Sequence, residues 1–461
     1  MRNDHTKREM IGHEGMVLLD MIRRLNRKGA SGPLGKVIEK THPADTAWVF
    51  RHLNEEERET IFNVVVTTTK IGDFLSELDD AVMIQLVGRM EPRQLADIVV
   101  EMPSDDAVDL LETIGEELAA QIRQFMQKQD LEEVDGLLKY HPESAGGLMS
   151  TDFMSLDQQL SVGEAIAIIQ EKSSEMEMVF YLYITTEDDK LAGVISLRQL
   201  LMNRPERKLK DIMNPHVISV NTDTDQGDVA HAVSQYNILA VPVVDSSYRL
   251  VGIVTVDDII DVIREEATED FLQMAGAGKD REILLKSTLD NAMLRAPWLF
   301  ASWVGGVLAM FIITAFEYEL AKVLALAAFI PVIMGMGGNI ATQSSTIIVR
   351  GIATGRVNMN ELLRVIFKEM RVGILLGFVY GVFLGILCTL IYQEPPLLGL
   401  VVGLSIFVIM AMAATIGTFV PLVLKRFGFD AAIATGPFVT TSIDILGVML
   451  YFYTARFILG L

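Results

Sequence analysis

The stretch Pro331-Val-Ile-Met-Gly-Met-Gly-Gly-Asn-Ile-Ala-Thr-Gln343 decides how the second half of the chain folds. It lies inside a long apolar run, yet it contains three glycines together with Asn339, Thr342 and Gln343. Lipid satisfies neither polar side chains nor exposed backbone, so such a segment must face other protein or a water-filled path. Close helix packing would also explain the glycines, but it accounts less well for the polar side chains. We therefore interpret the stretch as the inner wall of a pore. The candidate pore-lining residues here are Gly337, Gly338, Asn339 and Gln343.

Charge divides the chain into two parts. The 461 residues carry a formal net charge of −21 and a mean hydropathy of +0.34. Only 7 of the 60 acidic and 9 of the 39 basic residues lie at or after Pro297, so 53 acidic and 30 basic residues precede it. The acidic first part argues against nucleic acid and anionic lipid as its partners and favours cations. The nearly neutral, apolar last part predicts a membrane block in contact with lipid.

Other features restrict the class of protein further. The single cysteine, Cys388, lies in an apolar run, so we expect neither a disulfide framework nor a cysteine-based metal site. Residues Met1 to Met10 are charged and lack the apolar core of a signal peptide, so the first part should stay in the cytoplasm. We find no phosphate-binding loop, nucleophile elbow or metalloprotease helix, and we therefore expect a protein that is not an enzyme.

Residues from about Met10 to Tyr140 are predicted to be all-helical, in a first domain at residues 1–145. Segments 49–58, 74–80 and 98–106 each end one apolar helix and begin another with Asn, Asp or Ser, which are N-cap residues. A recurrence of roughly 25 residues favours short helical hairpins stacked as a small solenoid. Asp105 and Asp109 would share a helix face, although a solvated helix start also explains them.

A pattern of strands alternating with helices occurs twice after Leu148. The copies begin with Met149-Ser-Thr-Asp152 and Met213-Asn-Pro-His216, and each ends on a strand followed by a helix. This pair resembles tandem CBS domains, which fold as one α/β module and commonly sense nucleotides or ions. Thr255 and Asp258 resemble the ribose-contacting residues of that family, whereas Gln199 stands at the position of Asp258 in the first copy. The expected CBS domains are residues 146–209 and 210–263.

An acidic helix follows the second copy. Asp257 to Asp270 holds seven carboxylates and one arginine. Asp258, Asp261 and Glu265 lie three and four residues apart, so they share one face. Like charges at this spacing destabilise a helix by a few tenths of a kcal/mol per pair, and a divalent cation shared with another element would reverse that penalty. A solvated helix is the alternative. We expect a connecting segment at residues 264–295.

The remaining chain contains five apolar segments, each long enough to cross a hydrocarbon core that needs about 20 residues. The predicted spans are residues 297–315, 323–349, 372–392, 397–424 and 431–457, in a membrane domain at 296–461. Basic residues cluster between the second and third spans and between the fourth and fifth. Because positive loops stay inside, we expect a multi-pass protein of the cell (inner) membrane with its N-terminus in the cytoplasm and its C-terminus outside. The basic residues are Arg350, Arg356, Arg364, Lys368, Arg371, Lys425 and Arg426.

Two carboxylates, Asp430 and Asp444, belong to the fifth span. Asp430 also fits a helix N-cap. Asp444 is fourteen residues further, about 21 Å along a continuous helix, and an unpaired carboxylate at that depth costs at least a few kcal/mol. Between them, Gly436-Pro-Phe-Val-Thr-Thr-Ser442 offers a freed carbonyl and hydroxyl groups. Such hard oxygen donors favour Mg²⁺ or Ca²⁺ over zinc or copper. Further candidate pore-lining residues are Gly436, Pro437, Thr440 and Thr441.

The order of these features resembles the MgtE family of magnesium channels over the whole chain. The resemblance implies a homodimer with a central pore, and acidic cytosolic domains that bind Mg²⁺ when the ion is abundant. The connecting, or plug, helix then closes the gate. ATP is a candidate ligand of the CBS pair. By this resemblance the metal-binding positions are Asp430, Asp444, Asp258, Asp261, Glu266, Glu269, Asp270, Asp225 and Asp97.

The chain also departs from the family pattern. Ala341 and Ala431 replace a glycine and a proline, and Gly227, Ser234 and Asn237 stand where relatives have acids or metal-contacting backbone. The number of cytosolic metal sites therefore stays open. Two other functions also stay open: a CBS-regulated channel for Mn²⁺, Co²⁺ or Ca²⁺, and a membrane-anchored nucleotide or ion sensor without transport. Asp444 argues against an anion transporter.

Overall fold

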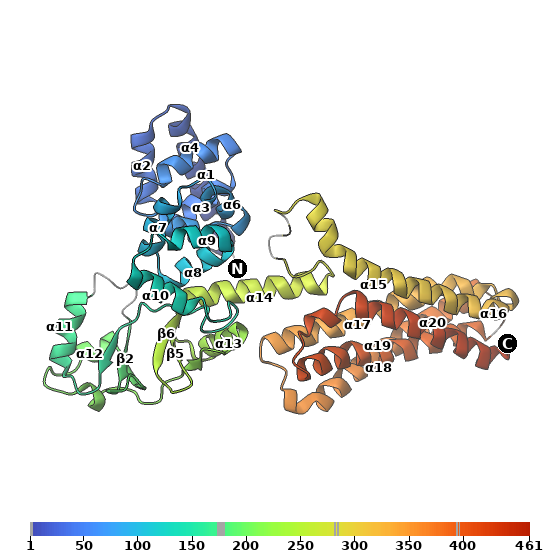
Figure 1. The fold of residues 1–461 in the computed structure, drawn as a ribbon. Coiled ribbons are helices and arrows are strands. Elements are labelled where there is room, and N and C mark those ends of the chain that lie inside the picture. Colours follow the sequence, from blue (N-terminus) through green and yellow to red (C-terminus); the bar gives the residue numbers. More distant parts are fainter. Residues whose placement is uncertain (1–2, 173–179, 281–282, 284, 393–394, 396) are drawn as a thin grey trace. The chain divides into compact units, whose positions relative to one another are not determined.

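The computed structural model describes residues 3–172, 180–280, 283, 285–392, 395 and 397–461 (Figure 1). The chain divides into two units, Met1–Ile260 and Asp261–Leu461, and the division falls within helix α14, Val256–Met274. The first unit contains short helices followed by two small sheets, and the second contains long apolar helices. The predicted fold class is confirmed.

The N-terminal part of the first unit is a stack of short helices. Its odd-numbered helices contact one another in order, with α1 on α3, α3 on α5, α5 on α7 and α7 on α9. Apolar side chains fill the contacts, and the rings of Phe50 and Phe74 meet edge to face at 5.4 Å. The arrangement is the predicted solenoid of helical hairpins. The bounds are α1 Asn3–Arg27, α2 Ser31–Lys40, α3 Pro43–Arg51, α4 Glu55–Val65, α5 Ile71–Ser76, α6 Asp80–Val87, α7 Pro92–Glu101, α8 Ser104–Thr113, α9 Glu116–Arg123 and α10 Lys128–Leu137.

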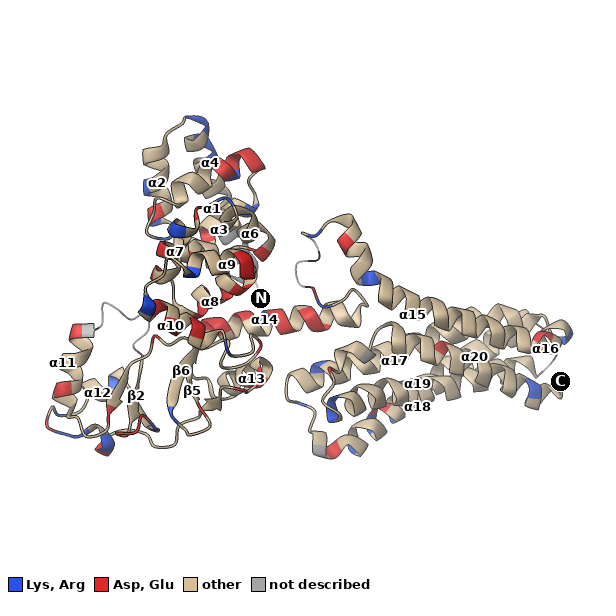
Figure 2. Cartoon of the chain, viewed as in Figure 1, with Lys and Arg blue, Asp and Glu red and all other residues tan. Residues whose placement is uncertain are grey.

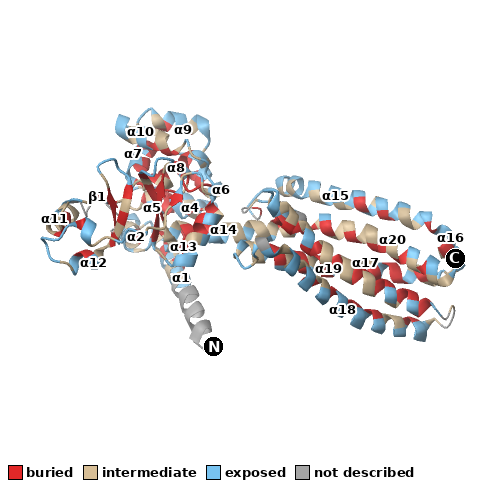
Figure 3. Ribbon diagram, turned by 90° about the horizontal axis from the view of Figure 1, so that it is seen from below, coloured by how far each residue is buried: buried red, intermediate tan, exposed pale blue. Residues whose placement is uncertain are grey.

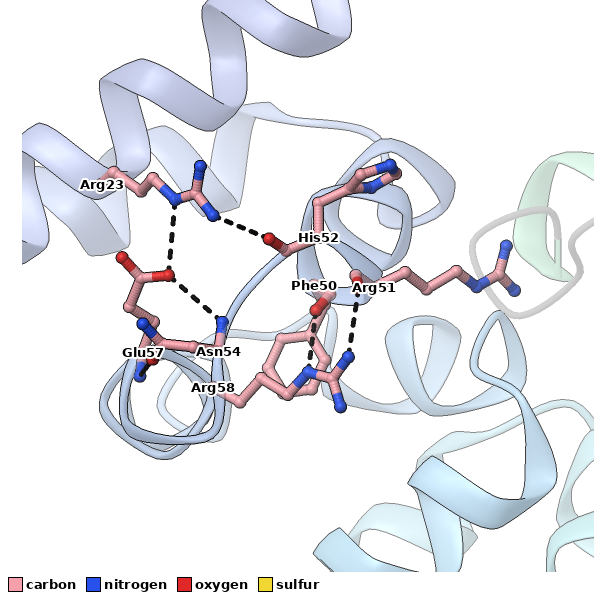
Figure 4. A network of polar contacts seen from close by, with 7 residues as sticks. All are labelled: Arg23, Phe50, Arg51, His52, Asn54, Glu57 and Arg58. Carbon is pink, nitrogen blue, oxygen red and sulfur yellow. Dashed lines mark hydrogen bonds and ion pairs between the residues drawn. The ribbon is translucent and has the colours of Figure 1, made fainter. Parts of the chain in front are cut away.

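Polar contacts fix the junction between α3 and α4, one of the predicted helix boundaries (Figure 4). Asn54 and Glu57 form a capping box at the start of α4. Arg23 of α1 donates to the Glu57 carboxylate at 3.4 Å and to the His52 carbonyl at 2.8 Å. Arg58 donates to the carbonyls of the last two residues of α3, both at 3.1 Å. These bonds satisfy carbonyls that the end of α3 leaves free.

The rest of the first unit is the predicted pair of α/β copies. Each copy forms a three-stranded sheet, ordered β1-β2-β3 and β4-β5-β6, in which the first two strands are parallel and the last two antiparallel. The bounds are β1 Ser155–Asp157, α11 Val162–Lys172, β2 Tyr181–Thr185, β3 Leu191–Ser196, α12 Leu197–Leu201, a 3₁₀ turn Leu209–Asp211, β4 Val220–Asn221, α13 Gln226–Tyr236, β5 Ala240–Val244 and β6 Leu250–Thr255.

The two copies interlock. A Cβ on Gly252 of β6 would lie 2.6 Å from Sδ of Met149, which begins the first copy. A Cβ on Gly193 of β3 would lie 2.6 Å from Sδ of Met213, which begins the second. The first residue of each copy thus packs on the last strand of the other. This reciprocal contact makes the pair one folding module, as the CBS resemblance implies.

In the second unit, five helices among the described residues are long and apolar enough to cross a membrane. They are α15 Thr288–Ala315, α17 Ala325–Ala353, α18 Leu362–Ile391, α19 Leu398–Arg426 and α20 Pro437–Leu459. Shorter elements are α16 Glu317–Lys322 and 3₁₀ turns at Met359–Glu361 and Ala432–Ala434. The five predicted spans are confirmed, with three boundaries corrected. α15 begins at Thr288, nine residues before the expected start of the first span and inside the expected connecting segment. α18 begins at Leu362, so Lys368 and Arg371 lie in its first turns rather than in a loop. The last helix begins at Pro437, not near Ala431.

Packing differs strongly among these helices. The core consists mainly of residues from α17, α19 and α20. α18 packs tightly on α19 through glycines, since a Cβ on Gly381 would lie 2.5 Å from the Gly403 carbonyl oxygen. Small residues at such contacts allow backbones to approach closely. The outer faces of α15 and α18 are exposed (Figure 3) and carry large apolar side chains, which suits contact with lipid.

Candidate ion path and cytosolic acidic cluster

One face of α17 carries exposed polar side chains in the middle of a spanning helix. Gly335, Asn339 and Gln343 are exposed at i, i+4 spacing. Within the described residues, the side chains of Asn339 and Gln343 have no hydrogen-bond partner. Lipid would leave these amides unsatisfied, so the face requires water or another copy of the chain.

Helix α20 adds oxygen donors beside this face. A Cβ on Gly338 would lie 3.9 Å from Oδ1 of Asp444 and 3.9 Å from the side chain of Thr440. Both α20 residues are half-buried. The Thr440 hydroxyl donates to the Pro437 carbonyl at 3.2 Å. The structure therefore brings together three predicted residues, Gly338, Thr440 and Asp444, next to Asn339.

Other predicted pore-lining residues face neighbouring helices of the same chain. Gly337 is buried, and a Cβ there would lie 2.9 Å from Ile443 and 3.0 Å from Ile409. The side chain of Thr441 packs against Gly305 of α15. Gly337 and Thr441 thus serve close helix packing in a single chain, which is the ordinary alternative considered for the glycines.

Asp430 lies in a loop ahead of the last helix. Its Oδ1 accepts a hydrogen bond at 2.8 Å from the amide of Ala432, the first residue of the short turn Ala432–Ala434. Its Oδ2 accepts from Nε2 of Gln273 at 2.8 Å. Because α20 begins at Pro437, Asp444 lies only about 10 Å along that helix from its start. The expected 21 Å of continuous helix between the two acids is therefore wrong. Proline fits the first turn of a helix, which explains the late start.

The C-terminal end of α14 packs against the start of α20. A Cβ on Gly436 would lie 2.9 Å from the Met274 carbonyl oxygen and 3.4 Å from that of Gln273. A Cβ on Gly276 would lie 3.0 Å from the Pro437 ring. Gly436 and Pro437 are thus predicted pore residues that contact the connecting helix directly. Any side chain at Gly436 would separate the two elements.

Acids gather at this end of α14 (Figure 2). Burial raises the pKa of Asp270 to about 6, with further contributions from Asp430, Glu266 and Glu269, while Arg350 lowers it. These predicted residues therefore lie close to one another and to Asp430. The repulsion among them opposes the packed arrangement, and a cation would relieve it.

A second acidic cluster lies in the first unit, between α8 and the start of α14. Burial raises the pKa of Asp105 to about 8, and the charges of Asp258 and Asp106 add to the effect. Burial also raises the pKa of Asp258 to about 6. Oδ1 of Asp105 is buried and has no hydrogen-bond partner among the described residues. Burial, with smaller effects from Asp73, Asp257 and Glu77, raises the pKa of Asp106.

This cluster fits a cation. An ionised carboxylate without a partner is costly in a buried position, and a divalent ion between Asp105 and Asp258 would remove that cost. Among the described residues, however, no three Asp, Glu, His or Cys side chains are placed to hold a metal ion directly. Water would therefore have to complete the coordination, as Mg²⁺ commonly requires.

Thr255 and Asp258 are in contact at the start of α14. The Thr255 amide donates to Oδ2 of Asp258 at 3.2 Å, and its hydroxyl contacts the same oxygen. Ser196 and Gln199, at the equivalent positions of the first copy, form a complete capping box. Stabilisation of the helix start accounts for this pattern in both copies, without a nucleotide.

Three predicted metal positions lie apart from these clusters. Asp225 caps α13 by accepting from the Gly227 amide at 3.0 Å. Asp261 is exposed and pairs with Arg264 at 3.1 Å. Asp97 is exposed on α7. On the helical domain it is Asp105 and Asp106, rather than Asp97, that face the start of α14.

Two further acids in the membrane block were not among the candidate residues predicted from the sequence. Glu369 of α18 is buried and accepts from the Ser344 hydroxyl of α17 at 3.1 Å. Glu319 of α16 is buried and pairs with Arg456 of α20 at 3.6 Å. The neighbouring basic residues made Glu369 look like part of a loop, and its place in the middle of an apolar helical pattern was the available signal.

The fold and the polar path define a multi-pass membrane protein of the cation-transporter class. Residues 330–454 match the family described as MgtE, divalent cation transporter. Residues 41–143 match the MgtE intracellular N domain, and residues 145–206 and 209–265 each match the CBS domain.

Full-length relatives identify the family. The chain is 35% identical over 428 residues to the magnesium transporter MgtE of Bacillus subtilis, covering 93% of this chain and 94% of that protein. It is 34% identical over 439 residues to the magnesium transporter MgtE of Thermus thermophilus, covering 94% and 96%. The chain belongs to the MgtE family.

Solved structures agree for the first part of the chain. The crystal structure of the soluble part of a magnesium transporter is 31% identical, with a TM-score of 0.50, and the match covers 55% of this chain and 99% of that one. The cytosolic domain of the Mg²⁺ channel MgtE in complex with ATP gives the same identity and TM-score, with 53% and 99% covered.

Proposed function

We propose that this chain carries Mg²⁺ across the cell membrane and that Mg²⁺ bound to its cytosolic acids closes the path. The observation that carries the proposal is the polar face of α17 beside Asp444, in helices that are otherwise apolar. The full-length relatives, named magnesium transporters, favour Mg²⁺ over the alternatives of another divalent ion or a sensor without transport.

The path is formed between two copies of the chain. One copy leaves Asn339 and Gln343 exposed, and a second copy facing them across a two-fold axis would enclose a polar, hydrated channel. The carboxylates along it would hold a Mg²⁺ ion that keeps its water shell. Such outer-sphere binding is weak enough to let the ion leave again, which conduction requires. Asp430 lies at the cytoplasmic end of this channel, which we call the mouth, and Asp444 lies further along the channel.

Closure depends on the two acidic clusters. When Mg²⁺ is abundant, an ion between Asp105 and Asp258 removes their repulsion and holds the start of α14 against the helical domain. Other ions at Glu266, Glu269 and Asp270 would hold its far end against the mouth. When Mg²⁺ is scarce, the carboxylates repel one another and α14 leaves the mouth. The ions shift the equilibrium between the open and closed states only by the difference between their affinities for these two states.

Two finer points belong to the same proposal. The basic ends of α17, α18 and α19 lie in the cytoplasm, which leaves the C-terminus outside. ATP binds between the copies of the CBS pair, a role that the similar domain crystallised with ATP supports. A nucleotide there would have to compete with the Asp258 carboxylate for the Thr255 hydroxyl.

Mg²⁺ entry into liposomes that contain the purified protein tests the proposal. A doubly charged hydrated ion about 5 Å from one carboxylate gains about 2 kcal/mol even at the dielectric constant of water. Asp430→Asn should therefore slow entry by at least about tenfold, because 1.4 kcal/mol corresponds to a factor of ten. Glu317→Gln, which changes an exposed acid outside the path, is the control. Entry of Ca²⁺ or Mn²⁺ without Mg²⁺, or equal entry by the wild type and the Asp430 variant, would contradict the proposal.

A further inference from the structure

Helix α14 ends in a turn that reverses the chain. Gly276 has a φ of +70°, which glycine adopts without steric cost. The amide of Gly276 donates to the Gln273 carbonyl at 2.9 Å, and that of Ala277 donates to the Leu272 carbonyl at 2.8 Å. This pair of bonds is a Schellman motif. The turn brings Lys279, three residues beyond the glycine, back to the acids of the last helical turns.

The Lys279 ammonium joins α14 to the mouth. Its Nζ lies 2.6 Å from Oε1 of Glu269 and 3.8 Å from Oδ2 of Asp430. Nε2 of Gln273 donates to the same two oxygens, at 3.0 and 2.8 Å. Two donors, one neutral and one charged, thus bridge a carboxylate of the connecting helix and the carboxylate at the mouth.

Exposure distinguishes the two donors. Gln273 is 1% exposed and is therefore fixed by its packing. The side chain of Lys279 is 61% exposed, whereas those of Glu269 and Asp430 are 14% and 34% exposed. The carboxylates are shielded while the ammonium is open to water. Lys279 is therefore the donor that can leave the two carboxylates and be replaced by water or an ion.

We propose that Lys279 is a tethered cation that holds the end of α14 on Asp430, so that closure of the mouth requires less bound Mg²⁺ than the acids alone would demand. This proposal rests on the proposed function, whose gate it describes in more detail. One ammonium cannot neutralise Glu266, Glu269, Asp270 and Asp430, even with Arg350 beside Asp270, so divalent ions still decide closure. Without the ammonium, Glu269 and Asp430 repel each other across the contact.

The test measures how cytosolic-side Mg²⁺ inhibits flux through the full-length protein in liposomes. For Lys279→Gln we expect the half-inhibiting Mg²⁺ concentration to rise about two- to fivefold, the range of a partly exposed ion pair. Maximal flux at low Mg²⁺ should not change. Lys279→Arg should keep the wild-type value. Lys286→Gln is the matched control, since Lys286 lies in the same segment but pairs with Asp280.

Charge can also be restored within one variant. Cys388, the only cysteine of the sequence, is buried, so a Lys279→Cys variant presents a single accessible thiol. Aminoethyl methanethiosulfonate exchanges onto that thiol, releases methanesulfinate and leaves an ammonium of nearly lysine length. It should restore the wild-type inhibition, and the sulfonatoethyl reagent, which adds a negative charge, should weaken inhibition further.

The outcomes separate this proposal from the function on which it rests. Absence of Mg²⁺ flux in the wild type would refute the proposed function. Normal flux and inhibition, with no shift in Lys279→Gln, would overturn the role of Lys279 alone. A shift that neither arginine nor the aminoethyl group restores would show a steric effect and would equally overturn it. In Glu269→Gln protein the lysine substitution should add little, because the bridge is already lost.

Discussion

Replacing Asp105 by asparagine should stabilise the first unit when divalent cations are absent. Burial, followed by the charges of Asp258 and Asp106, raises the pKa of Asp105 from 3.8 to about 8. At pH 7 the Asp105 carboxyl group is ionised in the unfolded chain and protonated in the folded chain. This pH lies about three units above the unfolded pKa of 3.8. Each unit corresponds to about 1.4 kcal/mol, so the carboxyl group costs folding about 4 kcal/mol. The buried asparagine amide has its own desolvation cost, which makes this value an upper bound.

The pH dependence follows from the sign of the shift. A folded pKa above the unfolded one means that the folded chain binds more protons between the two values, so stability falls as pH rises from about 4 to about 8. Without divalent ions, the wild type should therefore lose stability between pH 6 and pH 8. Asp105→Asn should show a smaller loss over the same interval, since Asp258 still titrates with a pKa of about 6.

Mg²⁺ should reduce the difference in stability between the two proteins. An ion that binds only the folded state stabilises it by RT ln(1 + [Mg²⁺]/Kd). The wild type, with both carboxylates, should gain more from Mg²⁺ than Asp105→Asn. Because the ion displaces the proton from Asp105, the gain of the wild type should grow from pH 6 to pH 8.

Hydrogen exchange of the α8 amides in the full-length protein measures both effects, with EDTA or Mg²⁺ at each pH. Asp109→Asn is the control, since Asp109 is an exposed acid on the same helix. The cost assigned to the buried carboxyl group would be refuted if Asp105→Asn exchanged as fast as the wild type in EDTA. Equal protection of both proteins by Mg²⁺ would refute the cation site between α8 and α14.

Two substitutions test the packing of the membrane block, each by thermal unfolding in detergent. Gly381→Ala should lower the unfolding free energy by about 1–3 kcal/mol, because its Cβ would lie 2.5 Å from the Gly403 carbonyl oxygen; Gly306→Ala, with open space around it, should have little effect. Arg456→Gln should cost about 1–3 kcal/mol, since it leaves Glu319, whose side chain is 5% exposed, without its cation. Arg456→Lys should recover part of this loss, and a full loss with lysine would contradict the ion-pair explanation.

The sequence was sufficient for the elements that depend on local pattern. Apolar runs of about 20 residues or more predict spanning helices, because backbone in lipid must form its hydrogen bonds within the helix. The tandem copies were visible because each copy repeats the same strand and turn residues. The stacked helices were visible because Asn, Asp and Ser residues cap their starts.

The sequence was insufficient where contacts between distant segments decide. Asp105 and Asp97 are both acids on short helices, and only the packing of α8 near the start of α14 distinguishes them. Glu369 was hidden among basic residues because a helix that crosses an interface carries charges in its first turns. The loop at Asp430 was missed because Ala431 and Ala432 continue a helical pattern, while the break depends on Gly436 and Pro437.

The position of α14 in the chain explains how the two clusters can act together. It is a helix of 19 residues, about 28 Å long, with Asp257 and Asp258 in its first turn and Glu269 and Asp270 near its last. A helix that is continuous over this length transmits a movement at one end to the other, whereas a loop would absorb it. Each ion contributes only the difference between its binding free energies in the open and closed states, and a tenfold difference corresponds to about 1.4 kcal/mol. Under the proposed mechanism, several weak sites on one helix would add their differences, and the gate would respond to Mg²⁺ more steeply than a single site would allow.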